Sequence, residues 1–186
     1  MSRLPHPADL TLPEGFSFLD GFLTTEEEAE LLVMFRSLPF QEFTYHGYVA
    51  KRRVLAWGWT YDFSSGEFSR GEVIPGFLLP LRIRAAAAAG IAAEDLVEAL
   101  LTEYTPGAQI GWHRDLPMFD IIIGISLGGS CTFRLKSYRK GERPLSLILP
   151  PRSLYVMRGA ARWKYQHSIP PVDELRYSIT FRTMKK

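Results

Sequence analysis

The chain has 186 residues, a mass of 21.1 kDa, 46% hydrophobic residues and 23% charged residues, values that indicate one globular domain and exclude wholesale disorder. Its single cysteine, Cys131, excludes an intramolecular disulfide and a cysteine-rich zinc site. The apolar runs are shorter than the roughly 18 residues that a membrane-spanning helix needs, and the N-terminus shows no signal-peptide pattern, so we expect a cytoplasmic protein without membrane contact.

Positive charge is concentrated toward the end of the chain. The net charge is +2, but residues 1–133 carry 9 Lys and Arg against 17 Asp and Glu, whereas residues 134–186 carry 13 against 3. A basic segment of this kind is typical of a protein that binds a polyanion. The alternative is a fold that intermixes both segments and leaves no basic surface.

The first elements predicted are an extended segment and a helix. Residues 1–22 are rich in proline and predict an extended lead-in. Thr25 and Glu28 have the spacing of a capping box in front of an apolar stripe, which predicts a helix over about residues 25–37. Pro39 ends this helix.

The next elements predicted are strands and a second helix. Residues 40–63 alternate aromatic and polar types, which indicates strands with turns at Gly47 and Gly58. Residues 64–76 contain serine, glycine and proline and predict a loop. A second helix is predicted over about residues 78–89, because a glycine follows this alanine-rich run.

The remaining half predicts mostly β structure. Residues 96–104 fit a helix or a strand equally well, and beyond them short apolar runs alternate with turn signals. This spacing favours a β-sandwich or barrel that follows the N-terminal helices within one domain. The expected strands are residues 119–127, 132–136, 145–149, 154–157 and 176–183.

A histidine and an aspartate form the first candidate site. His113 and Asp115 are two positions apart, so in extended chain both side chains point to the same side and can bind one metal ion. His167, on a distant strand, would complete a two-histidine, one-carboxylate face, which suits Fe(II) and oxygen chemistry. The His-x-Asp pair alone also occurs by chance as a hydrogen-bonded surface pair.

The last strand carries the second candidate site. Residues 176–182 alternate strictly, so Arg176, Ser178, Thr180 and Arg182 share one face. The backbones of the two arginines would lie about 20 Å apart, which leaves room between their guanidinium groups for a small dicarboxylate. A solvated edge strand would show the same alternation.

Together these residues resemble the AlkB-like Fe(II)/2-oxoglutarate-dependent dioxygenases. The stretch from Tyr104 to Asp115 is similar to that family's Tyr-x-x-Gly-x-x-x-x-x-His-x-Asp segment, and His167 and residues 176–182 follow in the family's order. The resemblance covers residues 96–183 well and the N-terminal half loosely.

The resemblance implies an α+β, mainly β fold. This fold is a double-stranded β-helix, or jelly roll, with N-terminal helices packed on one sheet. The single domain, residues 1–186, would comprise an N-terminal extension and substrate lid at about 1–76 and a jelly-roll catalytic core at about 96–183. Nothing in the sequence suggests more than a monomer.

The resemblance also implies the cosubstrate contacts. Tyr104 and Arg176 would hold the distal carboxylate of 2-oxoglutarate, and Arg182 would lie near the carboxylate that chelates the iron. Thr102 and Ser178 stand where the family often has asparagine, and their hydroxyl groups keep a hydrogen-bonding function at both positions.

The implied activity is oxidative demethylation. In this reading His113, Asp115 and His167 bind Fe(II), and the enzyme uses 2-oxoglutarate and O2 to hydroxylate an N-alkyl carbon, after which the product loses an aldehyde. The usual substrates are 1-methyladenine and 3-methylcytosine, so the expected partner is alkylated DNA or RNA with the base single-stranded or flipped out.

One departure from the family favours an alternative substrate. Leu116, Pro117 and Met118 stand where the best-known repair members carry acids near the alkylated base. A cationic methylated base favours a nearby carboxylate. The alternative is an oxygenase of the same fold that acts on a protein side chain or a small metabolite.

The expected substrate contacts lie mainly in the lid. Trp57, Trp59, Tyr61 and Phe63 alternate along the chain and would share one face, either as a platform for a base or, for the two tryptophans, as part of the core. Candidates for phosphate contacts, or else for a solvated surface, are the basic residues Lys51, Arg52, Arg53 and Arg114.

Overall fold

The computed structural model describes residues 5–45, 48–61, 66–138 and 141–186, and it contains two antiparallel sheets. The large sheet has the order β1-β10-β7-β12-β5-β3-β2, with β4 paired to β3. The small sheet has the order β6-β11-β8-β9. In the large sheet the strands are β1 (Phe16–Leu19), β10 (Leu154–Met157), β7 (Phe119–Gly128), β12 (Arg176–Met184), β5 (Leu96–Tyr104), β3 (Tyr48–Tyr61), β2 (Gln41–Tyr45) and β4 (Phe68–Arg70). In the small sheet they are β6 (Ile110–His113), β11 (Tyr165–Ile169), β8 (Cys131–Ser137) and β9 (Leu145–Leu149).

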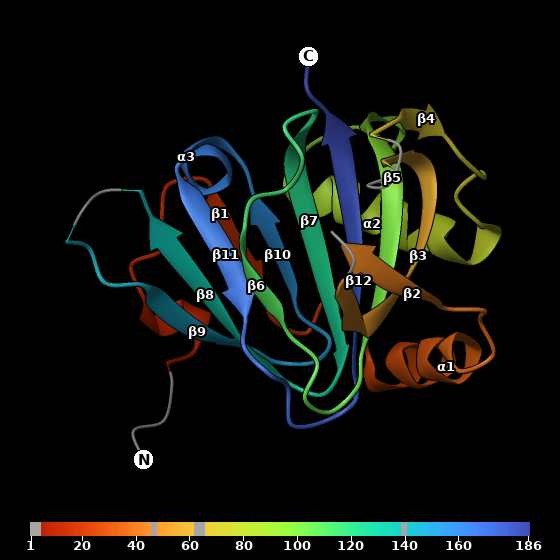
Figure 1. The fold of residues 1–186 in the computed structure, drawn as a ribbon, viewed down its shortest axis with the longest axis horizontal. Coiled ribbons are helices and arrows are strands. Elements are labelled where there is room, and N and C mark those ends of the chain that lie inside the picture. Colours follow the sequence, from red (N-terminus) through yellow and green to blue (C-terminus); the bar gives the residue numbers. More distant parts are fainter. Residues whose placement is uncertain (1–4, 46–47, 62–65, 139–140) are drawn as a thin grey trace.

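Two hydrophobic cores hold the layers together. One core packs α1 (Thr25–Phe35) and α2 (Leu79–Ala89) on the large sheet, and the other fills the space between the two sheets. Figure 1 shows the small sheet on one side of the large sheet and the two helices on the other side. The expected jelly roll with helices packed on one sheet is therefore confirmed. A short helix, α3 (Gly159–Trp163), precedes β11. None of the helices in the described ranges is long and apolar enough to cross a membrane.

The first helix begins close to its predicted position, but its cap differs. The capping box is formed by Thr24 and Glu27, one residue earlier than the sequence predicted. The Glu27 amide donates to Thr24 Oγ1 at 3.1 Å, and the Thr24 amide donates to Glu27 Oε2 at 2.9 Å. The predicted cap was wrong because the side chain of Glu28 turns toward the sheet instead of back along the chain.

Glu28 fastens α1 to the large sheet. Its carboxylate is buried and accepts hydrogen bonds from the backbone amide of Gly128 at 2.9 Å and from Arg152 Nη1 at 2.8 Å. Gly128 is the last residue of β7, and Arg152 lies in the turn before β10. A helix near the start of the chain is thus connected to the centre of the sheet.

The region predicted as strands and turns forms the strand β2 and the long strand β3, which pair antiparallel. The turn predicted at Gly58 is absent, because β3 runs through this glycine with a φ of +83°. A Cβ atom here would collide with the carbonyl oxygen of Val97. At this irregularity β3 changes partner from β5 to β4. The other predicted turn, Gly47, lies outside the described residues.

Several observed strands were not predicted from the sequence. Residues 96–104, which fitted a helix or a strand, form the strand β5. The predicted second helix is confirmed as α2, and Gly90 ends it in a left-handed conformation. The strands β1, β4 and β6 were not among the predicted strands, and β4 corrects the loop predicted over residues 64–76. In β6 the short apolar pattern is interrupted, because its inner face carries the metal-site residue His113.

Candidate metal centre and cosubstrate pocket

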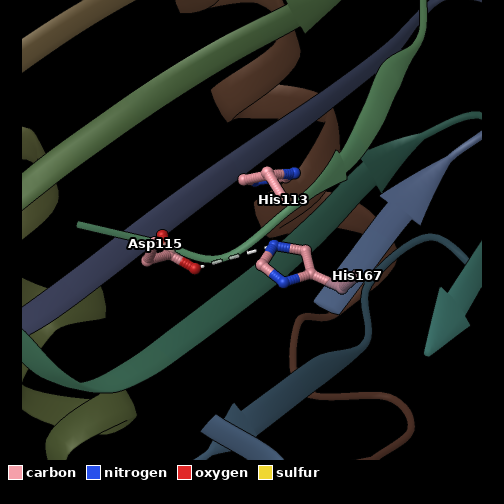
Figure 2. Close-up of side chains that lie close together, drawn as sticks. All are labelled: His113, Asp115 and His167. Atoms are coloured by element: carbon pink, nitrogen blue, oxygen red, sulfur yellow. Dashed lines mark ion pairs between the residues drawn. The ribbon is translucent and has the colours of Figure 1, made fainter. Parts of the chain in front are cut away.

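Three side chains converge between the two sheets in the manner of metal ligands. His113 ends β6, Asp115 follows it in the loop, and His167 lies on β11 directly opposite His113. One ligand atom from each residue lies within 4.8 Å of the others. Figure 2 shows the three side chains pointing toward one another. The predicted set is therefore brought together by the pairing of β6 with β11.

The free oxygen of Asp115 fits a bound cation. Asp115 Oδ2 is buried, accepts no hydrogen bond from the described residues, and lies 3.6 Å from His167 Nε2. The other oxygen, Oδ1, accepts hydrogen bonds from Nε and Nη2 of Arg182 at 2.8 and 2.6 Å. Because Arg182 occupies Oδ1, Oδ2 is the oxygen directed at a metal ion.

The protonation states of the three residues also suit a metal ion. Burial lowers the pKa of His167 to about 3, and the nearby His113 acts in the same direction. Burial alone would raise the pKa of Asp115, but the charge of Arg182 outweighs it and the pKa falls below its usual value. His113 Nδ1 lies 2.9 Å from the carbonyl oxygen of Gly111, to which it donates, so Nε2 is free to bind metal. At neutral pH the site offers two neutral imidazoles and one carboxylate.

The opposite end of the pocket holds a buried cation. Arg176 is 1% exposed, and within the described ranges no carboxylate forms an ion pair with it. Its Nε donates to Ser126 Oγ at 3.1 Å, its Nη1 has no partner, and its guanidinium lies 5.0 Å from the Tyr104 ring centroid. A buried guanidinium in this state needs an anionic ligand, and a carboxylate matches its planar geometry.

A cavity of about 950 Å³ connects the two ends. It brings together most of the residues that the sequence singled out. The predicted residues that line it are His113, Asp115, His167, Tyr104, Arg176, Arg182, Thr102, Ser178, Tyr61, Arg114, Lys51 and Arg52.

Two predicted substrate contacts lie elsewhere. Arg53 points to the other face of the sheet, where its guanidinium binds Glu103 at 2.7 Å, so it does not line the cavity and its contact with phosphates stays a prediction. Trp59 stacks on Phe68 with ring centroids 5.1 Å apart and is not among the residues that line the cavity. The predicted contact Phe63 lies outside the described residues.

The lid aromatics also differ from the predicted common face. Trp57 is buried in the core beneath the helices, where its ring meets Phe77 edge-on. Trp59 instead stacks on Phe68, which belongs to the core between the sheets. The reason is Gly58, whose positive φ interrupts the regular alternation between these two tryptophans.

The sequence model of the 2OG-Fe(II) oxygenase superfamily matches residues 15–182, a span that includes both ends of the pocket. The chain belongs to this superfamily. Its relatives include the alkylated DNA repair protein ALKBH8 homolog of Arabidopsis thaliana, 25% identical over 96% of this chain and 58% of the relative. The tRNA (carboxymethyluridine(34)-5-O)-methyltransferase alkbh8 of Xenopus tropicalis is 26% identical over 87% of this chain and 26% of the relative. An uncharacterized mimivirus protein, L905, is 32% identical over 48% of this chain and 49% of its own length.

Among solved structures, OsALKBH1 superposes with a TM-score of 0.74 at 16% identity, covering 94% of this chain and 99% of that one. This match confirms the fold. The chain spans about half the length or less of most of these curated relatives. The AlkB-like resemblance of the motifs is confirmed, and the chain has the fold and the residue set of a 2OG-Fe(II) oxygenase.

The residues of this dioxygenase fit its cofactors. His113, Asp115 and His167 would hold Fe(II), and Arg176 with Tyr104 would hold 2-oxoglutarate. When bound, the iron and 2-oxoglutarate together activate O2 for oxidation of a C–H bond. The chain itself orients Asp115 through Arg182 and keeps both imidazoles neutral. A contact between Arg182 and 2-oxoglutarate stays a prediction, because three nitrogens of Arg182 already bind protein carboxylates.

Sequence reasoning missed two residues of this site. Glu98, on β5, is buried, lines the cavity and accepts from Arg182 Nη1 at 2.6 Å. Alternation backward from Tyr104 and Thr102 would have placed it on the cavity face. Arg162, on α3, uses Nη2 to hold the carbonyl oxygens of Asp115, Leu116 and Phe119. No local sequence pattern predicts this contact, because it joins segments more than 40 residues apart.

Glu98 allows a prediction about metal affinity. Glu98→Ala should weaken Fe(II) or Co(II) binding about tenfold, because loss of a residue that supports a ligand typically costs 10- to 100-fold. Arg182 would lose the carboxylate that fixes its orientation toward Asp115. Titration of the purified protein with Co(II) measures the effect, and thermal unfolding checks the fold. Glu98→Gln, which keeps an acceptor for Arg182, should recover most of the affinity. Wild-type affinity in Glu98→Ala would mean that Arg182 holds Asp115 unaided.

Proposed function

We propose that this dioxygenase oxidatively demethylates alkylated bases in DNA or RNA, of the 1-methyladenine and 3-methylcytosine type. The proposal is supported above all by the lining of the cavity. Tyr61 offers an aromatic ring, and Lys51, Arg52 and Arg114 offer positive charge beside the same cavity that contains the metal ligands. A ring for stacking a base and cations for its phosphates are the two groups that a flipped or single-stranded nucleotide requires.

The main argument against a methylated base is weaker in the structure than in the sequence. The three residues directly after Asp115 include no acid, and Leu116 lines the cavity at that point. A carboxylate nevertheless reaches the cavity from another strand, because Glu98 lies on β5. Two relatives carry names that refer to alkylated DNA repair and to tRNA modification, and these names support a nucleic-acid substrate.

The test uses purified enzyme with Fe(II), 2-oxoglutarate and single-stranded oligonucleotides that contain 1-methyladenine or 3-methylcytosine. The methylated strand should yield formaldehyde together with an equal amount of succinate beyond that formed without substrate, and an unmethylated oligonucleotide should yield no formaldehyde. Tyr61→Ala should lower kcat/KM for the methylated strand roughly 5- to 150-fold, because base stacking contributes about 1–3 kcal/mol. Turnover of 2-oxoglutarate without substrate should persist in this variant.

Tyr61→Phe is the matched control, since it keeps the ring and should retain most of the activity. The proposal fails if the wild-type enzyme turns over 2-oxoglutarate but leaves both bases unchanged in every strand context. A protein side chain or a small metabolite then becomes the favoured substrate class.

A further inference from the structure

We infer that a strip of aromatic and basic side chains beside the cavity is the docking surface for the single strand of nucleic acid that carries the substrate base. This inference rests on the proposed function and adds a partner surface to it. The strip, named here the small-sheet strip, consists of Trp112, Arg114, Arg134, Lys136 and Tyr138.

The first part of the strip lies on the outer face of the small sheet. His113 pairs with His167, which pairs with Leu135, and these residues share the inner face. Their neighbours Trp112, Arg134 and Lys136 therefore project to the opposite, outer face. There the guanidinium of Arg134 lies 4.9 Å, and the ammonium of Lys136 5.9 Å, from the Trp112 ring centroid.

The second part of the strip continues to the end of the sheet beside α3. Arg114 lies 5.0 Å over the ring of Tyr138 and donates from Nη1 to the carbonyl oxygen of Trp163 at 3.2 Å. Lys185 in turn lies 4.9 Å over the Trp163 ring. Cations and aromatic rings thus alternate from β6 and β8 to α3 and to the residue that follows β12.

The charge of this surface is predominantly positive, with Asp120 at its α3 end, where it accepts from Trp163 Nε1 at 3.0 Å. The strands β6, β8, β9 and β11 and the helix α3 contain no aspartate or glutamate. None of the three cations of the strip forms an ion pair with an acid in the described part of the chain.

Other cations of the basic C-terminal segment are used inside the protein. Arg152 binds Glu28, Arg158 donates to the Ala89 carbonyl oxygen, and Arg182 binds two carboxylates. The fold therefore uses part of the C-terminal positive charge internally, while Arg134 and Lys136 remain on the outer face of the small sheet.

The strip is continuous with the active-site cavity. Although the Trp112 side chain faces outward, Trp112 and Arg114 flank the metal ligand His113 in the chain, and both residues border the cavity. A single strand of nucleic acid bound along the small-sheet strip would therefore pass next to the metal centre. One of its bases could turn into the cavity while neighbouring phosphates and bases stay on the strip.

Aromatic rings distinguish a nucleic acid from an acidic protein as the partner. A polyanionic peptide needs only cations, whereas unpaired bases also stack on aromatic rings and on guanidinium planes. Tyr138 is 54% exposed. Of the large hydrophobic residues that are exposed in the described ranges, Tyr138 is the only aromatic one. The combination of exposed cations with accessible rings is that of a surface for single strands.

The experiment measures binding of an unmethylated single-stranded oligonucleotide, by fluorescence anisotropy at several salt concentrations. Tyr138→Ala should weaken binding roughly fivefold or more, because it removes a stacking ring. Lys136→Gln should lower the slope of log K against log salt by about 1, because one phosphate contact is lost. Arg36→Gln, which removes an exposed cation at the end of α1, is the matched control and should bind as the wild type does. All three variants should turn over 2-oxoglutarate normally in the absence of substrate.

Failure of this inference differs from failure of the proposed function. Equal binding by wild type, Tyr138→Ala and Lys136→Gln would overturn the strip even if methylated bases are oxidised. If both variants bind the oligonucleotide more weakly but the wild type oxidises no methylated base, the proposed function is refuted and the docking surface still holds. Equally tight, strip-dependent binding of a poly-glutamate peptide would also overturn the inference, because the surface would then recognise negative charge alone.

Discussion

Asp115→Ala is expected to abolish metal-dependent turnover of 2-oxoglutarate. The substitution removes the one anionic ligand and leaves two neutral imidazoles, so Fe(II) affinity should fall by more than about 100-fold. The buried Oδ2 of Asp115 accepts no hydrogen bond from the described residues, so its removal takes a ligand from the metal and breaks no hydrogen bond of that oxygen. Succinate production and Co(II) titration measure the two effects.

The control for this experiment is a histidine outside the site. His6 lies near the N-terminus, 3.5 Å from Asp20, and His6→Ala should bind metal and produce succinate as the wild type does. Removal of Asp115 leaves Arg182 bound to Glu98, so the fold should persist, and thermal unfolding verifies this. Normal succinate production by folded Asp115→Ala would show that these three residues do not form the iron site.

Arg176→Ala is expected to raise the requirement for 2-oxoglutarate about 30-fold or more. Loss of one partner of a buried charge-assisted contact typically costs about 2–5 kcal/mol. Arg176 is buried and has a free Nη1, so its guanidinium is available to a carboxylate from the cosubstrate. The KM for 2-oxoglutarate, from succinate production at saturating Fe(II), measures the effect.

One further variant and one further measurement test the same prediction. Arg176→Lys should recover only part of the affinity, because an ammonium group cannot form the paired, planar contact. Metal affinity should stay unchanged in Arg176→Ala, since this residue contacts none of the three metal ligands. If the KM for 2-oxoglutarate did not change, the carboxylate of the cosubstrate would have to bind elsewhere in the cavity.

The sequence predicted the metal ligands and the arginine strand because their spacing fixes their direction. In extended chain, residues two apart share a face, so His113 and Asp115 converge, and Arg176 and Arg182 enter the same cavity. The partner His167 was also identifiable, because histidines are rare in this chain. These predictions needed only local geometry and the order of the motifs.

The contacts that the sequence did not predict depend on pairing between distant strands. Arg53 follows two basic residues and looked like part of a basic run, yet the register of β3 with β5 places it opposite Glu103. Glu98 appeared as one acid in an apolar strand, and only its pairing with Arg182 across β5 and β12 shows its role. Alternation fixes the face of a residue, but the register decides its neighbour.

The contact between Glu28 and Gly128 has a consequence for local unfolding of the protein. The Gly128 amide donates to a helix side chain instead of to a neighbouring strand, so its exchange with solvent deuterium depends on detachment of α1 from the sheet. Gly128 also pairs in register with Arg176 on β12. A partial opening that begins at α1, on the far side of the large sheet from the iron ligands, would therefore reach the cosubstrate arginine before it disturbs the metal centre.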